Sequence, residues 1–207
     1  MKLPSDLMEK TVQELGKLPG IGKKTALRLA LHLVQSDLSV AEALGGSIQQ
    51  MRREIKFCKV CNNISDDDTC SICNNQRRDK SIICVVESIR ELLIIENTGH
   101  YNGVYHVLGG LISPIDNINP DDLKIEQLIK RVETGNVSEL IMALSPTMEG
   151  DTTVFYISRK LDAHPVKITS IARGVAFGTE IEYTDDVTLA RSIASRQPFD
   201  AYMNGKQ

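Results

Sequence analysis

The sequence predicts an α/β fold that carries small additional modules at its N-terminal side and a helical segment at its C-terminal end. Two observations lead to this fold class. From residue 79 onward, short apolar stretches alternate with helical patterns, which is typical of a parallel sheet covered on both faces. Before it, residues 1–55 have helical periodicity and residues 56–78 contain four cysteines in two pairs. We therefore expect helices, a metal-binding segment and a sheet, in that order.

The first 55 residues are predicted to form helices joined by a tight connection. Leu27, Leu31 and Val34 recur at the helical spacing of i, i+4 and i+7, which predicts one apolar helix face. The string 18–22, Leu-Pro-Gly-Ile-Gly, precedes that helix. Its proline and two glycines favour a short turn. The region is therefore interpreted as two helices linked by a hairpin.

The region after residue 79 gives the main sheet. Apolar runs predict strands, and patterns with a period near 3.6 residues predict helices between them. The predicted strands are 81–86, 104–108, 139–144 and 167–171, and the predicted helices are 88–97, 121–134 and 152–161. The predicted domains are 1–55 (helical), 56–78 (cysteine-bearing), 79–174 (sheet) and 175–207 (C-terminal segment).

The charge distribution differs between the two ends of the chain. Residues 1–57 carry nine Lys or Arg against six Asp or Glu, whereas residues 81–207 carry eleven against seventeen, within a net charge of −3. Residues 16–34 contain four basic residues and no acidic one, which favours contact with phosphates. We find no membrane span or signal peptide in the sequence and expect a cytoplasmic protein.

Four cysteines predict a structural metal site. Cys58, Cys61, Cys70 and Cys73 form two C-x2-C pairs separated by eight residues, a spacing that closes a tetrahedron of thiolates around Zn²⁺ with no open position. Two disulfides or free thiols are the alternative, which a reducing compartment disfavours. Cys84 lies in an apolar run and is interpreted as a core residue.

The hairpin is a candidate phosphate-binding site. Gly20 and Gly22 leave backbone N–H groups uncovered next to a helix N-terminus, and Lys23, Lys24 and Arg28 follow them. Such a contact holds the nucleic acid backbone without reading bases. The alternative is an ordinary turn with a solvated basic face. The string from residue 18, with Ala26 and the apolar helix, resembles the helix-hairpin-helix module of DNA repair proteins.

Three acidic residues are placed near the ends of predicted strands. Glu87 ends the first strand of the sheet, and Glu149 and Asp151 follow the third. The carboxyl ends of parallel strands meet in one crevice, so these residues could hold Mg²⁺; three solvated carboxylates are the alternative. The pattern resembles the Toprim domain, with Glu149 in the place of an aspartate. Arg173 either lines the same crevice or forms a simple salt bridge.

Taken in order, the hairpin, the four-cysteine site and the Toprim sheet resemble the bacterial RecR recombination mediator family over essentially the whole length. Shared strings include Tyr105 to Gly110, Pro146 to Gly150 and Ala172-Arg173-Gly174. The resemblance implies a mediator that is not an enzyme. It would act with RecO and RecF to load recombinase on single-stranded DNA, as a dimer or a ring-like tetramer that surrounds DNA. The resemblance also implies that residues 1–55 bind DNA, that 56–78 form a zinc finger and that the C-terminal segment 175–207 is an oligomer contact.

Two other functions remain open from the sequence. A magnesium-dependent nuclease of the Toprim type would use Glu87, Glu149 and Asp151, and a zinc-ribbon adaptor would bind only proteins. The mediator interpretation predicts sequence-tolerant binding of single- and double-stranded DNA, a structural Zn²⁺ with Mg²⁺ as a weaker possibility, and a nucleoid-associated location in the cytoplasm.

Overall fold

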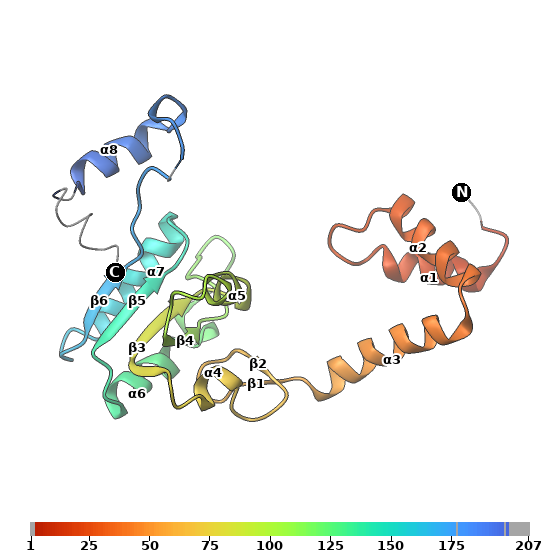
Figure 1. Cartoon of the computed structure of the whole chain (residues 1–207), viewed down its shortest axis with the longest axis horizontal. Helices are drawn as coiled ribbons and strands as arrows, with labels where there is room; N and C mark the ends of the chain where they lie inside the picture. Colours follow the sequence, from red (N-terminus) through yellow and green to blue (C-terminus); the bar gives the residue numbers. More distant parts are fainter. Residues whose placement is uncertain (1–2, 177, 197, 199–207) are drawn as a thin grey trace. The chain divides into compact units, whose positions relative to one another are not determined.

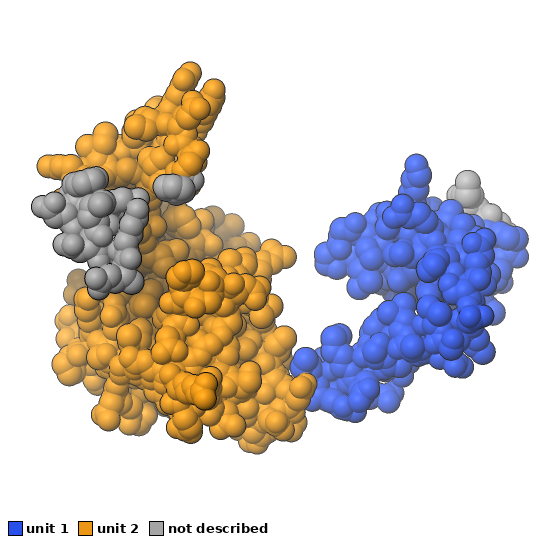
Figure 2. All heavy atoms as spheres, in the orientation of Figure 1, with its two compact units in different colours: residues 1–55 blue, residues 56–207 orange. Residues whose placement is uncertain are grey.

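The structure of the chain is a computed structural model that describes residues 3–176, 178–196 and 198. The chain divides between Ile55 and Lys56 into two compact units (Figure 2). Each unit is described by itself below. None of the helices found in this described part of the chain is long and apolar enough to cross a membrane.

The first unit consists of three helices, α1 (Asp6–Leu15), α2 (Lys23–Gln35) and α3 (Leu38–Glu54) (Figure 1). The helices α1 and α2 pack through Val12, Ala26 and Ala30, which are all buried. The predicted apolar face of α2 is only partly correct, since Leu31 and Val34 remain exposed. The two alanines face α1 instead, because small side chains allow two helices to approach closely.

The second unit contains a four-stranded parallel sheet, as the sequence predicted. Its strands lie in the order β4-β3-β5-β6. The strands agree with the predicted ranges to within two residues at each end: β3 is Asp79–Val86, β4 is Gly103–Val107, β5 is Glu139–Ala143 and β6 is Lys167–Ser170.

The second half of the central strand β3 is buried on both faces of the sheet, whereas its first two residues are exposed. Ile83 and Val85 pack in a cluster with residues of α6 (Ile125–Thr134) and α7 (Met148–Lys160). Cys84 and Val86 point to the opposite face, where they pack with Leu92 of α5 (Ile89–Asn97). Alternate side chains of a strand point to opposite faces, so an unbroken apolar run is required wherever helices cover both sides. Cys84 is a core residue, as predicted.

Two predicted helices have different beginnings in the structure. The predicted helix 121–134 is split into a short 3₁₀ turn, η1 (Pro120–Asp122), and α6. Pro120 starts the turn, and Leu123 then adopts an extended backbone, which interrupts the helix. The helix predicted from residue 152 begins four residues earlier, because the Thr147 side chain accepts a hydrogen bond from the Gly150 N–H and caps α7.

The first cysteine pair lies in the loop between the short antiparallel strands β1 (Lys56–Phe57) and β2 (Ile64–Ser65). The second pair lies at the N-cap and within the single-turn helix α4 (Ser71–Asn74). After the sheet, the 3₁₀ turn η2 (Ile181–Tyr183) leads to α8 (Asp186–Ala194), the predicted C-terminal helical segment. Residues 177, 197 and 199–207 of that segment lie outside the described residues.

His106 on β4 is a buried polar residue of the sheet. Its Nε2 lies 2.9 Å from the Lys124 carbonyl oxygen, and Nδ1 is buried without a partner among the described residues. Burial lowers the pKa of His106 to about 4, so the ring is neutral at pH 7 and Nε2 donates the hydrogen bond.

Candidate functional site

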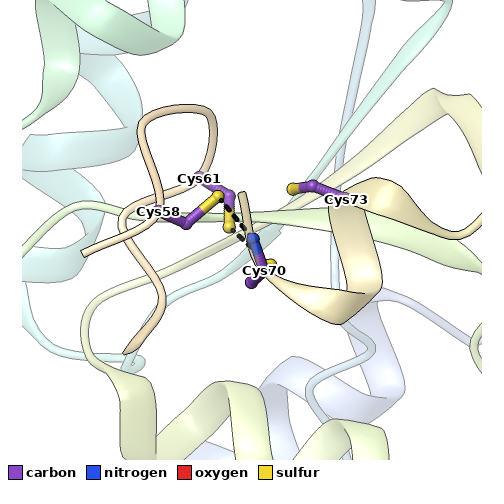
Figure 3. A group of neighbouring side chains, drawn as sticks. All are labelled: Cys58, Cys61, Cys70 and Cys73. Atoms are coloured by element: carbon purple, nitrogen blue, oxygen red, sulfur yellow. Dashed lines mark hydrogen bonds between the residues drawn. The ribbon is translucent and has the colours of Figure 1, made fainter. Parts of the chain in front are cut away.

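The four predicted metal ligands come together in one buried cluster. Cys58 and Cys61 follow β1, Cys70 caps α4, and Cys73 lies within that helix. One sulfur atom from each residue lies within 4.8 Å of the other three, and all four residues are buried. Figure 3 shows the side chains gathered around one centre. A tetrahedral zinc site has Zn–S distances of about 2.3 Å, which requires sulfur atoms about this close.

The local backbone holds the cysteine pairs in position. The Asn62 N–H donates to the Cys58 carbonyl oxygen over 2.9 Å, and Asn62 has a φ of 61°, in the left-handed region. The Cys70 N–H donates to the Cys58 sulfur over 3.3 Å. This N–H···S contact stabilises a thiolate, as expected of a metal ligand.

The thiol chemistry of the cluster also fits a metal. All four cysteines are free, so the disulfide alternative is wrong for this structure. The sulfur atoms of Cys61 and Cys70 are 3.5 Å apart. Hydrogen bonds from Cys61 and Cys73 lower the pKa of Cys70, whereas the pKa values of Cys61 and Cys73 themselves are raised, so the negative charge of the cluster lies mainly on Cys70. Four thiol ligands leave no position for water, so the site suits a structural Zn²⁺ rather than catalysis.

The cysteine cluster is hydrogen-bonded to the sheet. The Val107 N–H of strand β4 donates to the Cys61 carbonyl oxygen over 2.8 Å. Asn62 Nδ2 donates to Gln127 Oε1 over 2.9 Å, and Gln127 Nε2 donates to the Lys59 carbonyl oxygen over 2.6 Å. Since β4 is an edge strand, these bonds connect the metal site to the sheet edge and to α6.

Sequence reasoning missed the roles of Asn62 and Gln127. Asparagine tolerates the left-handed conformation better than most residues, so Asn62 directly after Cys61 was a signal for the tight turn. Gln127 carried no comparable signal, because an isolated polar residue on a helix normally faces solvent.

The hairpin turn has the predicted backbone geometry. Pro19 and Gly20 are its central residues, Gly20 has a φ of 78°, and the Ile21 N–H donates to the Leu18 carbonyl oxygen over 3.1 Å. Proline followed by a glycine with positive φ is typical of a type II turn. A Cβ atom added at Gly20 or Gly22 would meet nothing within 4 Å, so the backbone is open to an approaching ligand.

The N-terminus of α2 is positively charged and has no side-chain cap. Gly22 is the N-cap residue, so no side chain accepts a hydrogen bond from the first amides, and the first turn has no acidic residue. Lys23, Lys24 and Arg28 are exposed, and none forms a salt bridge within the described residues. Free amides, the helix dipole and these charges all attract an anion.

The three acidic residues occupy different surroundings. Glu87 Oε1 accepts a hydrogen bond from Ser145 Oγ over 3.0 Å, whereas its Oε2 is buried without a partner in the described structure. Glu149 and Asp151 both lie in the first turn of α7. Asp151 forms a salt bridge of 2.8 Å with Arg173, which lowers the pKa of Asp151.

The structure does not preassemble these acids as a cation site. In the described part of the chain, only the four cysteines form a group of potential metal ligands within 4.8 Å of one another. The unpartnered oxygen of Glu87 would suit a cation, but Asp151 is already neutralised by Arg173. The Mg²⁺ assignment to these three residues stays a prediction.

Gly150 allows α7 to begin close to the preceding turn. A Cβ atom at this position would lie 2.0 Å from the Ser145 carbonyl oxygen. The glycine therefore brings the first turn of α7, with Glu149 and Asp151, against the segment that contacts Glu87. Close backbone packing therefore requires a glycine at position 150 of the string Met148-Glu149-Gly150.

These modules define a class: a Toprim protein that also carries a helical hairpin and a four-cysteine zinc finger. The family models match in the same order. They are the RecR helix-hairpin-helix over residues 8–52, the RecR four-cysteine zinc finger domain over 55–75, the Toprim domain over 81–172 and the RecR C-terminal region over 174–197.

Curated relatives are similar to this chain over nearly their full length. A protein named Recombination protein RecR from Phocaeicola vulgatus is 59% identical, over 95% of this chain and 96% of its own. Proteins of the same name from Parabacteroides distasonis and Flavobacterium psychrophilum are 55% and 52% identical, over 96% and 97% of both chains. The chain belongs to the RecR family. The predicted family, fold class and structural zinc are confirmed.

Proposed function

We propose that the protein is a DNA-binding recombination mediator that acts without catalysing a reaction. It would work with RecO and RecF to load recombinase on single-stranded DNA, in the cytoplasm and at the nucleoid. The relatives are named recombination proteins, and the open hairpin offers a contact for DNA. The observation that carries the proposal is the uncapped, basic N-terminus of α2 directly behind that hairpin.

The mode of DNA binding follows from the chemistry of the hairpin. Backbone amides and the side chains of Lys23, Lys24 and Arg28 contact phosphates, which are the same in every sequence. Binding is therefore sequence-tolerant, applies to single and double strands, and weakens as salt rises because counterions are released. Gly20 and Gly22 are the positions where the DNA backbone comes closest.

The test is DNA binding by a Lys23→Ala/Lys24→Ala variant, measured by fluorescence anisotropy over a salt series. We expect weaker binding and a salt slope that is smaller by about one unit for each phosphate that the variant no longer neutralises. An Arg52→Ala/Arg53→Ala variant is the control, because it removes two charges of the same unit from the last turn of α3. Equal affinities of the hairpin variant and the unaltered protein would refute the assignment of the DNA site.

We further propose a homo-oligomer, a dimer or a ring-like tetramer that surrounds DNA. A row of apolar side chains on α3 supports assembly, since Leu44, Ile48 and Met51 are 44%, 54% and 56% exposed at helical spacing. Apolar rows of this kind are typical of protein contacts. The measurement is the native mass of the protein with and without DNA. A monomer at working concentration in both cases would exclude the clamp.

A magnesium-dependent nuclease is the competing function, supported by the unpartnered oxygen of Glu87. The salt bridge of Asp151 with Arg173 argues against it, because a cation would have to displace the guanidinium group. Cleavage of DNA in the presence of Mg²⁺ that is lost in Glu87→Gln would establish the nuclease. A zinc-ribbon adaptor that binds only proteins is excluded if the unaltered protein binds DNA at all.

A further inference from the structure

A cavity lies where the strands β5 and β6 end. Its volume is about 370 Å³, and its lining includes Pro146 after β5, Ala172, Arg173 and Gly174 after β6, and Thr188 and Arg191 of α8. In open α/β sheets, ligands bind at the carboxyl ends of the strands. We call this cavity the arginine pocket. Neither the zinc site nor the hairpin contributes a residue to it.

The two arginines of the pocket have donors available for a ligand. The guanidinium group of Arg191 forms no salt bridge with any side chain of the described residues, although it lines this cavity and two adjoining ones. Arg173 uses one of its terminal nitrogens for Asp151. A guanidinium group has five N–H donors in a planar fork, so Arg173 keeps several donors free.

The pocket suits an anion better than a cation. Asp151 is bound to Arg173, and the charge of Arg191 also acts on it. Asp185, at the start of α8, accepts a hydrogen bond from the Thr188 N–H. The lining itself contains two guanidinium groups and no acidic residue, which makes the pocket surface positively charged. A phosphate group matches the fork geometry of arginine and can form two parallel hydrogen bonds with it. The Thr188 side chain lies on the same lining, but its hydroxyl is hydrogen-bonded to Asp185.

We propose that the arginine pocket binds a phosphate group through Arg173 and Arg191. The phosphate belongs either to a free nucleotide or to the backbone of a nucleic acid. In the second case the pocket is a further DNA contact and deepens the proposed function. Its arginines lie on the unit that carries the sheet, so the pocket can be tested separately from the lysines of the hairpin.

Calorimetric titration of the full-length protein tests the proposal with three probes, namely inorganic phosphate, ATP and a single-stranded oligothymidylate. The oligonucleotide is titrated into the Lys23→Ala/Lys24→Ala variant, so that a failure of the hairpin assignment does not affect the result. We expect Arg191→Gln to weaken binding of the active probe about tenfold, as for the loss of a charged hydrogen bond. If ATP binds more tightly than the oligonucleotide, the pocket is a nucleotide site. If the oligonucleotide binds more tightly than ATP, the pocket is a contact for the nucleic acid backbone.

The control variant is Arg159→Gln, which removes the same charge from the last turn of α7, at the end of that helix opposite Asp151. Its affinity for the probe should equal that of the unaltered protein. Absence of binding by all three probes would overturn the proposal. Equal losses of probe affinity in Arg159→Gln and Arg191→Gln would also overturn the proposal, because the loss of affinity would then follow from the net charge alone.

Asp151→Asn separates an anion site from a cation site by the sign of its effect. The substitution removes a negative charge beside the pocket and releases Arg173, so phosphate affinity should rise severalfold. If the acids formed a Mg²⁺ site through which phosphate is bound, the same substitution would lower the affinity in the presence of Mg²⁺. A decrease would therefore contradict the arginine pocket.

Discussion

The zinc finger and the crevice at the carboxyl ends of the strands differ in how their residues are brought together. The four cysteines come from residues 58–73, and the local turns place all four sulfur atoms around one buried centre. In the crevice, Ser145 contacts Glu87 across 58 residues, and Arg173 contacts Asp151 across 22. The first site is closed and buried, whereas the second is open and partly solvated.

This difference shows what each site can do. A closed site of four thiolates has no free ligand position and contributes folding free energy through the metal. The crevice contains charged groups that contribute little to folding but keep hydrogen-bonding capacity for a ligand. Substitutions in the two regions should therefore separate loss of stability from change of binding.

The largest effect is expected from Cys58→Ser, which removes one of four zinc ligands. The variant should lose zinc and several kcal/mol of stability, since the binding energy of a structural metal is folding energy. The loss of stability should extend to strand β4, because the Cys61 carbonyl oxygen accepts a hydrogen bond from the Val107 N–H. Zinc content, thermal unfolding and native mass measure these changes, and DNA binding should fall only as a consequence.

Cys84→Ala is the control for this substitution, because Cys84 is a buried thiol that belongs to the sheet core and not to the zinc site. It should keep its zinc. A Cys58→Ser protein that remains folded and oligomeric but no longer binds DNA would show that the zinc loop is a contact surface.

A smaller loss of stability is expected for Gln127→Ala, which cuts the hydrogen bonds from α6 to Asn62 and to the Lys59 carbonyl oxygen. Partly buried groups left without partners cost about 1–3 kcal/mol. Zinc should remain bound, but hydrogen exchange at β4 and the zinc loop should become faster. Lys130→Ala, on the exposed side of the same helix, should have no such effect. Similar exchange rates in both variants would show that the zinc finger is not coupled to the sheet through Gln127.

The sequence predicted the sites that depend on local spacing. The interval between Cys58 and Cys73 is short enough for the turns alone to gather the ligands. The hairpin was predicted for the same reason, because Pro19 and Gly20 restrict the backbone locally. Burial of β3 on both faces also followed from its unbroken apolar run.

Contacts between distant segments were not predictable in this way. The sequence left two roles open for Arg173, and the structure shows both, since the side chain lines the crevice and pairs with Asp151. Arg191 lines the same cavity as Arg173 because α8 lies beside the ends of β5 and β6. No local pattern encodes that packing.

The smallest effect on stability is expected for Asp151→Asn, which breaks the salt bridge of the crevice. The carboxylate is 52% exposed and the Arg173 side chain 28% exposed, and pairs in solvent contribute only about 0–1 kcal/mol. The free energy of unfolding, measured in denaturant, should therefore change by less than about 1 kcal/mol. A larger loss would mean that Arg173 fixes α7 to the segment after β6, as the cysteines fix the zinc finger. A small change, together with altered phosphate affinity, would show that the charges of the crevice serve ligand binding and not the fold.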